Sequence, residues 1–145
     1  MRIDTLGSMI AARLVVIAHD TPVRSAASAL STAQIGLIVV CDENGRAVGV
    51  VSKSDLIRHL STMGVADAPV ADLMSRNIIS CRPEDDLYAT WQRMSAQSLQ
   101  NMPLLSPDLR PLGVLDVRDA LKALLEQEKY EERLLFNYVT GIGYQ

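Results

Sequence analysis

The sequence contains one short stretch twice, and these two copies decide the fold. The first copy reads GVVSKSDL at residues 49–56, and the second reads GVLDVRDA at residues 113–120. Both begin with a glycine and two aliphatic residues, and both carry an aspartate at the seventh position. An apolar run that ends in Ser or Asp, with another Asp three residues later, predicts a strand that leads directly into a capped helix.

The offset of 64 residues between the two copies continues on both sides without a gap, from about Leu6 to Leu60. Few of the aligned residues are identical. The apolar positions nevertheless keep register: Leu14 aligns with Ile78, Val23 with Leu87, Leu30 with Met94, Val40 with Leu104, and Ile57 with Leu121. Because apolar positions, one glycine and one aspartate agree together, the chain is predicted to contain two repeats of one structural unit.

Each repeat is predicted to have the order β-α-β-β-α. In the first repeat we expect strands at residues 14–18, 37–41 and 47–51, with a helix of apolar spacing from Val23 to Leu30. In the second we expect strands at residues 78–81, 102–105 and 112–115, with a helix over residues 87–94. The pair Asn44-Gly45 marks a hairpin between the second and third strands.

These patterns divide the chain into residues 5–62 (repeat 1), 63–69 (linker), 70–126 (repeat 2) and 127–145 (C-terminal helical extension). A repeat of about 60 residues buries little surface alone. We therefore expect the two sheets to pack against each other around a pseudo-two-fold axis.

Composition excludes several classes of function. The chain is 48% hydrophobic but only 4% aromatic, which predicts a globular core of aliphatic residues. The net charge of −3 and the lack of a Lys/Arg run exclude a nucleic-acid partner. Cys41 and Cys81 lie in apolar runs with no metal-ligand spacing, so no metal site is expected. No apolar run approaches the length of a membrane span or forms a signal peptide, which predicts a cytoplasmic protein without membrane contact.

The repeated motif in its β-α-β-β-α frame resembles the cystathionine-β-synthase (CBS) domain pair, also called a Bateman module, over roughly residues 5–126. The first copy matches the family pattern G-h-h-[ST]-x-x-D-h, whereas the second has Asp116 where the family has Ser or Thr. The resemblance implies an α/β (α+β) fold of two tandem CBS repeats related by pseudo-two-fold symmetry, here with a long C-terminal helix. It also implies a regulatory module that binds an adenine nucleotide (AMP, ATP, NAD(H) or S-adenosylmethionine) between the repeats.

The resemblance also assigns roles to residues. Asp55 and Asp119 are expected to accept hydrogen bonds from ribose hydroxyls, and Ser52 to lie where a helix N-terminus favours a phosphate. The full set of expected ligand-binding residues is Ser52, Lys53, Asp55, Val16, Ile17, Leu37, Ile38, Ile79, Ser80, Asn101, Met102, Pro103, Asp116, Arg118 and Asp119. Helix capping by Ser52 with Asp55, and by Asp116 with Asp119, is an alternative explanation of the same motif.

Asp116 predicts that the two clefts differ. A carboxylate about 6 Å from a phosphate costs roughly 3 kcal/mol at an effective dielectric constant of about 20, or about a hundredfold in affinity. The cleft with Ser52 and Asp55 is therefore expected to hold the phosphorylated nucleotide. The cleft with Asp119 is expected to be empty, to hold a ligand with its phosphate turned away, or to bind a cationic group.

The second repeat is followed by a helical pattern that continues through a charged middle to an apolar end at residues 134–139 and stops at Gly141. We expect this end to pack on a second copy in a homodimer; packing on its own chain is the alternative. An enzyme is not expected, because His19 and His59 lie at non-corresponding positions and no nucleophile is spaced with a base. A ligand-free protein–protein interaction module is the alternative function, and in either case the effector protein is unknown.

Overall fold

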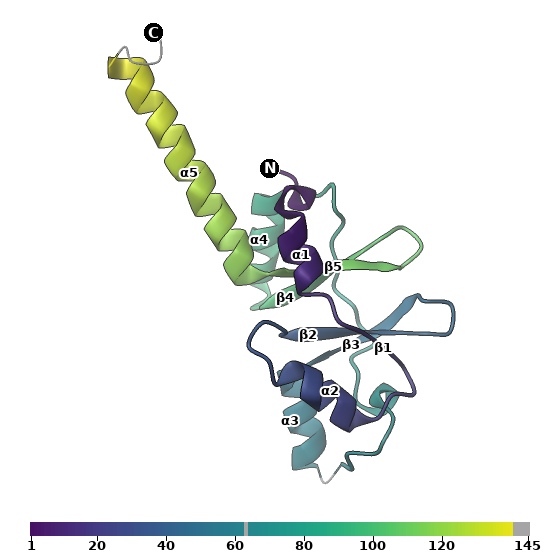
Figure 1. Cartoon of the computed structure of the whole chain (residues 1–145). Helices are drawn as coiled ribbons and strands as arrows, with labels where there is room; N and C mark the ends of the chain where they lie inside the picture. Colours follow the sequence, from purple (N-terminus) through teal and green to yellow (C-terminus); the bar gives the residue numbers. More distant parts are fainter. Residues whose placement is uncertain (63, 141–145) are drawn as a thin grey trace.

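The computed structural model describes residues 1–62 and 64–140, which form two lobes with a long helix leaving one of them (Figure 1). The elements in chain order are η1 (Ile3–Leu6), α1 (Ser8–Ala12), β1 (Val16–Ala18), α2 (Val23–Leu30), β2 (Leu37–Cys41), β3 (Ala47–Ser52), α3 (Lys53–Ser61), η2 (Val70–Asp72), α4 (Leu87–Ala96), β4 (Asn101–Leu105), β5 (Pro111–Asp116) and α5 (Val117–Thr140). The mixed α+β fold of two repeated units with a C-terminal helix is confirmed. We call the lobe with β1–β3 the first lobe and the lobe with β4 and β5 the second lobe.

The first lobe contains the predicted three-stranded sheet. Strand β1 pairs parallel with β2, and β2 pairs antiparallel with β3. The hairpin between β2 and β3 turns at Gly45, whose φ of +78° lies in the left-handed region that glycine tolerates best. Asp42 Oδ1 accepts hydrogen bonds from the backbone N–H groups of Asn44 and Arg46 and so holds the turn closed.

The second lobe differs from the prediction in its first strand. The strand expected at residues 78–81 is reduced to an isolated parallel bridge between Cys81 and Leu104, which leaves β4 and β5 as a two-stranded sheet. In the first lobe, Val39 N–H donates to the Val15 carbonyl at 3.0 Å. The residue 64 positions after Val39 is Pro103, which has no N–H to donate, so the equivalent ladder bond is not possible.

The segments before each first strand are exchanged between the lobes. Ile3, Leu6 and Ile10, all from the N-terminal segment, are buried in the core of the second lobe. Val70 and Met74, which precede the second repeat's strands, are buried in the core of the first lobe. Each lobe therefore completes its core with a segment that belongs, by sequence, to the other repeat.

The exchange explains why a glycine repeats at the same place in both copies of the motif. A Cβ on Gly113 would lie 2.9 Å from the carbonyl oxygen of Ile10, and a Cβ on Gly49 would lie 3.0 Å from that of Ser75. The Gly113 distance is shorter than a side-chain carbon allows, and a Cβ on Gly49 would also lie 2.5 Å from Met74 Sδ, so glycine at both positions lets the exchanged segment approach the strand this closely.

The two sheets meet across a small apolar interface, with Val39, Cys41, Ala47 and Leu105 buried there. Ala47 N–H also donates to the Leu109 carbonyl of the other lobe at 2.8 Å. Cys41 and Cys81 are both buried free thiols, and burial raises the pKa of Cys81 to about 12. Both cysteines are therefore buried residues of the lobes and not exposed thiols.

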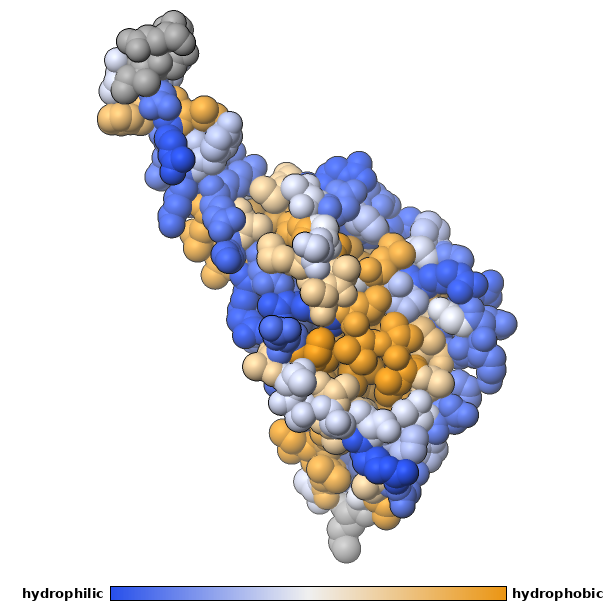
Figure 2. Space-filling model, in the orientation of Figure 1, coloured by the Kyte–Doolittle hydropathy of each residue, from blue (hydrophilic) through white to orange (hydrophobic). Residues whose placement is uncertain are grey.

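Helix α5 continues the second repeat for 24 residues and projects beyond the body of the molecule (Figure 1). Its middle is hydrophilic and its far end is apolar again (Figure 2). The predicted helix end at Gly141 and the rest of the predicted extension, residues 141–145, lie outside the described residues. Within residues 1–62 and 64–140, no helix is both long and apolar enough to cross a membrane.

Candidate functional site

A pocket of about 670 Å³ lies between the lobes at the start of α3. It receives residues from the α2–β2 loop, β3, the start of α3, residues 75–79, the loop before β4, β4 itself, the end of β5 and the start of α5. Its lining residues are Ala33, Gly36, Leu37, Val50, Ser52, Lys53, Ser54, Asp55, Ser75, Asn77, Ile79, Ser98, Leu99, Gln100, Asn101, Pro103, Asp116 and Arg118. A volume of this size is in the range that binds small ligands.

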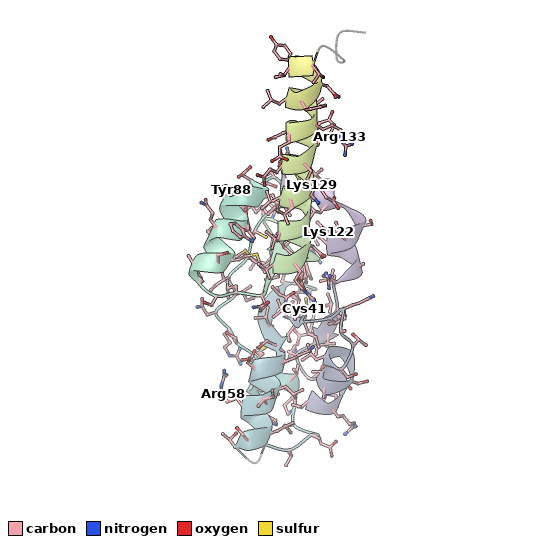
Figure 3. The ribbon with its side chains drawn as sticks, turned by 90° about the vertical axis from the view of Figure 1, so that its left-hand side faces the viewer. Cys41, Arg58, Tyr88, Lys122, Lys129 and Arg133 are labelled. Atoms are coloured by element: carbon pink, nitrogen blue, oxygen red, sulfur yellow. The ribbon has the colours of Figure 1, made fainter. Side chains whose placement is uncertain are left out.

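Ser52 and Asp55 form a capping box at the start of α3. Ser52 Oγ accepts from Asp55 N–H at 3.3 Å, and Asp55 Oδ2 accepts from Ser52 N–H at 2.9 Å. The capping interaction that the alternative predicts is therefore present in the first repeat. The other oxygen, Asp55 Oδ1, accepts from the guanidinium of Arg58 at 3.2 Å, and Arg58 lies along the outer side of α3 (Figure 3).

The second copy of the motif has a different arrangement. Asp116 Oδ1 accepts from Arg118 N–H at 2.8 Å and from Arg118 Nε at 3.0 Å, while Oδ2 accepts from Arg118 Nη2 at 2.9 Å. Burial would raise the pKa of the Asp116 carboxyl, but the hydrogen bonds from Arg118 and the charge of Arg13 outweigh burial and hold the pKa below its usual value. Asp116 is thus ionised and paired with arginine, which corrects the assumption that its charge stands uncompensated in the cleft.

Asp119, the counterpart of Asp55, is bound by Arg13 from the segment after α1. Arg13 Nε donates to Asp119 Oδ2 at 2.5 Å, and Arg13 Nη2 donates to Asp119 Oδ1 at 3.0 Å. Arg13 Nη1 donates to the carbonyl of Gln34 at 2.8 Å and lies 3.6 Å from Asp116 Oδ2. A bidentate arginine–carboxylate pair of this kind is geometrically specific as well as strong.

The structure brings most of the predicted site residues together. Those that line the pocket are Ser52, Lys53, Asp55, Leu37, Ile79, Asn101, Pro103, Asp116 and Arg118. Arg118, one of the expected ligand-binding residues, donates to Asp116.

The other six predicted residues lie elsewhere. Ile38 and Met102 are fully buried in the cores of the two lobes, because successive residues of a strand point to opposite faces. Ile17 packs on the first core, Val16 is exposed on β1, and the Ser80 carbonyl accepts from Arg93. Asp119 is engaged with Arg13.

Asn101 has a property that its sequence position did not predict. Its Oδ1 atom is buried and, among the described residues, has no hydrogen-bond partner. The side chain lies against Gly36, where a Cβ would come within 2.5 Å of Asn101 Nδ2. A buried amide oxygen without a partner is costly unless a donor reaches it.

Arg13, Asn77 and the loop of residues 98–100 were not predicted from the sequence. A signal for the first two was present, because Arg13 and Asn77 are 64 residues apart and therefore occupy equivalent positions in the two repeats. Asn77 lines the open pocket, whereas Arg13 lies against Asp119.

Comparison with known families agrees with this architecture. The CBS domain family matches the chain twice, over residues 6–62 and 70–126, and together these matches cover most of it. The chain belongs to the CBS domain family. The two matched segments correspond to the two repeats separated by 64 residues.

Relatives of this CBS pair include both small and large proteins. An uncharacterized 17.7 kDa protein of Acidianus ambivalens is 21% identical over 79% of this chain and 69% of its own length. The 5′-AMP-activated protein kinase subunit gamma-3 of Bos taurus is 26% identical over 77% of this chain, which spans only 24% of that subunit.

Solved structures share the fold. A CBS domain protein from Pyrobaculum aerophilum complexed with AMP has a TM-score of 0.72 and 21% identity, covering 82% of this chain and 89% of that one. A CBS domain pair in complex with 5′-methylthioadenosine and S-adenosyl-L-methionine has a TM-score of 0.73 and 18% identity, covering 88% and 98%. At these identities the likeness establishes the fold.

The described residues of this CBS pair contain no group of three or more His, Cys, Asp or Glu side chains that suits a metal ion. His19 Nε2 lies 2.9 Å from an oxygen of Glu43, and His59 Nε2 lies 3.0 Å from the carbonyl of Val65. Neither histidine lines the pocket between the lobes.

Proposed function

We propose that this CBS pair is a regulatory, non-catalytic module that binds one phosphorylated adenine nucleotide of the AMP type in the pocket between its lobes. The observation that carries the proposal is the pocket itself, with an acidic cap, a helix N-terminus and an unpartnered amide meeting in one space of about 670 Å³. The complexes that two structural neighbours form with AMP and with adenosyl ligands support the same choice of ligand class.

Asp55 is suited to hold a ribose. Its carboxylate offers about four lone-pair sites, and its partners within the chain are Ser52 and Arg58. The Arg58 side chain is 69% exposed, so its ion pair with Asp55 is weak and easily replaced. Two vicinal hydroxyls would donate to Asp55 in place of Arg58 while the capping box stays intact.

The start of α3 is suited to hold a phosphate. Ser52, Lys53 and Ser54 line the pocket at the N-terminus of this nine-residue helix. Free backbone N–H groups and the helix dipole favour an anion there, and the ammonium group of Lys53 adds a positive charge.

The opposite wall is suited to an adenine ring. Leu37, Ile79 and Pro103 supply apolar surface, and Asn101 Oδ1 supplies a hydrogen-bond acceptor. Adenine carries an exocyclic amino group, which donates to such an oxygen. Guanine carries a carbonyl at the same ring position and would face the Asn101 oxygen with another acceptor.

A thermal-shift and native mass spectrometry panel of AMP, ATP, NAD(H), S-adenosylmethionine and GMP tests the proposal. We expect AMP at 100 times its Kd to raise the free energy of unfolding by about 2.7 kcal/mol, with no shift from GMP. Mass spectrometry should show one AMP per chain. A panel in which no adenine compound shifts the transition contradicts the proposal and favours the ligand-free interaction module.

We propose further that the protein is a homodimer held by the end of α5. Leu134, Leu135, Phe136 and Val139 are 50–75% exposed on a helix that has left the body of the molecule. Lys122, Lys129 and Arg133 follow one another along the same helix (Figure 3), so the apolar end is separated from the lobes by a charged stretch. Such an apolar end is stabilised when it is covered, and a second copy offers an identical partner.

A chain that ends at Lys129 tests the dimer. We expect light scattering to give the mass of two chains for the full protein and of one chain for the truncated form. A truncated chain that remains dimeric contradicts the role of the α5 end, and a monomeric full-length chain contradicts the dimer. Circular dichroism of both forms controls for folding.

A further inference from the structure

We propose that Arg13 is a plug: its side chain closes the half of the inter-lobe cleft that contains Asp119 (the second half). It thereby limits this CBS pair to one nucleotide. The inference rests on the proposed function and explains why one nucleotide, and not two, binds per chain. The plug consists of Arg13 with its partners Asp119, Asp116 and the carbonyl of Gln34.

The pseudo-symmetry shows what Arg13 replaces. A shift of 64 residues carries Asn77, Ser98 and Asp55, which all line the open pocket, onto Arg13, Gln34 and Asp119. In the open half the short Asn77 side chain leaves space beside Asp55. In the second half the longer Arg13 side chain extends to the aspartate and to the Gln34 carbonyl, so it fills the equivalent space.

The contacts of Arg13 remove the groups that a ribose would need. Both oxygens of Asp119 accept from the Arg13 guanidinium, at 2.5 and 3.0 Å. The side chains are 19% and 12% exposed, respectively, so water reaches this pair far less than it reaches Arg58 beside Asp55. A sugar would have to separate a bidentate, mostly buried pair, and each ion would then need a new partner.

The charges in the second half also give no attraction for a phosphate. Arg13 and Arg118 are balanced by Asp116 and Asp119, all within one connected group of ion pairs. Asp116 and Arg118 also line the open pocket, so this neutral group lies where the two halves meet, and the cation that occupies the second half is Arg13. This replaces the expectation that repulsion by Asp116 alone would exclude the nucleotide.

Two opposite sets of substitutions test the plug. The double variant Arg13→Asn/Asp116→Ser gives the second half the residues of the first at these two positions and removes one charge of each sign, so that the group stays neutral. We expect it to bind two AMP per chain in native mass spectrometry and calorimetry, where the unmodified chain binds one. The reciprocal variant Asn77→Arg places a guanidinium beside Asp55 and should lose AMP binding without disturbing the Arg13–Asp119 pair.

The outcomes separate this inference from the proposed function. Two AMP bound by the unmodified chain, or one bound by the double variant, overturns the plug and leaves the nucleotide-binding proposal standing. No AMP bound by the unmodified chain or by the double variant overturns the proposed function. If the double variant does not fold, as judged by circular dichroism, Asn77→Arg decides: retained binding of one AMP shows that an arginine at this position does not close a half of the cleft.

Discussion

Deletion of residues 1–12 is expected to unfold the second lobe, although these residues precede every strand of the chain. Ile3, Leu6 and Ile10 are 0%, 7% and 7% exposed in the core of that lobe. Loss of one buried Ile or Leu side chain typically costs about 2–5 kcal/mol, and a domain of this size is stable by only about 5–15 kcal/mol. Three such losses therefore equal most or all of the stability available.

Backbone contacts add to this loss. Ile3 N–H donates to the Asp85 carbonyl at 3.0 Å, and Leu87 N–H at the start of α4 donates to the Met1 carbonyl at 2.8 Å. Urea denaturation followed by circular dichroism measures the effect, and Ile3→Ala is a milder version, expected to cost about 2–5 kcal/mol. Ile57→Ala is the control, because the Ile57 side chain is 66% exposed and its loss should leave the unfolding transition nearly unchanged. If the deletion of residues 1–12 unfolds at the same urea concentration as the full chain, the exchanged packing is wrong.

Asp55→Asn is expected to weaken AMP binding by about two orders of magnitude. The substitution keeps the size of the side chain but removes its charge and one acceptor oxygen. Hydrogen bonds to charged groups contribute about 1.5–3 kcal/mol each, so weakening two of them costs roughly 3 kcal/mol, or about a hundredfold in affinity. Isothermal titration calorimetry measures the change, and thermal unfolding checks for the small loss expected from the altered capping box.

Asp119→Asn is the matched control, because this residue holds the same position in the second copy of the motif but is bound by Arg13. We expect its AMP affinity to equal that of the unmodified chain. Its melting temperature should fall, since Arg13 loses its charged partner in a mostly buried position. Equal losses of affinity in both variants, or a loss confined to Asp119→Asn, would contradict the assignment of the ligand to the Asp55 side.

Much of the architecture followed from local patterns. The strands at 37–41 and 47–51, helix α2 and the Asn44-Gly45 turn were predicted because apolar spacing and turn chemistry depend on near neighbours in the chain. The site was predicted less completely: Leu37 faces the pocket, but its neighbour Ile38 faces the core. The family resemblance indicated that residues 37–38 lie near the ligand. The pleat of the strand decides which of these two adjacent side chains a ligand can reach.

One proline shows how a single residue prevents one repeat from forming a strand that the other repeat forms. The first strand of repeat 2 was expected by analogy with repeat 1, but Pro103 has no N–H for the ladder, and only the bridge at Cys81 remains. This departure was readable in the sequence once the strand partner of residues 78–81 was known. Pairing partners are long-range information, which a local pattern does not contain.

The apolar register and the repeated motif were thus sufficient to predict two tandem units, their fold class and the position of Asp55 in the first turn of α3. These features arise between residues that are close in the chain. Which lobe receives the segment before each repeat, and which of the two motif aspartates pairs with Arg13, depended on contacts between residues far apart in the chain. Arg13 and Asp119 are 106 positions apart, and only the packing of the N-terminal segment onto the second lobe brings the guanidinium to the carboxylate. An ion pair over that separation exists only once the chain has folded, because the backbone must first hold both side chains within a few ångströms of each other.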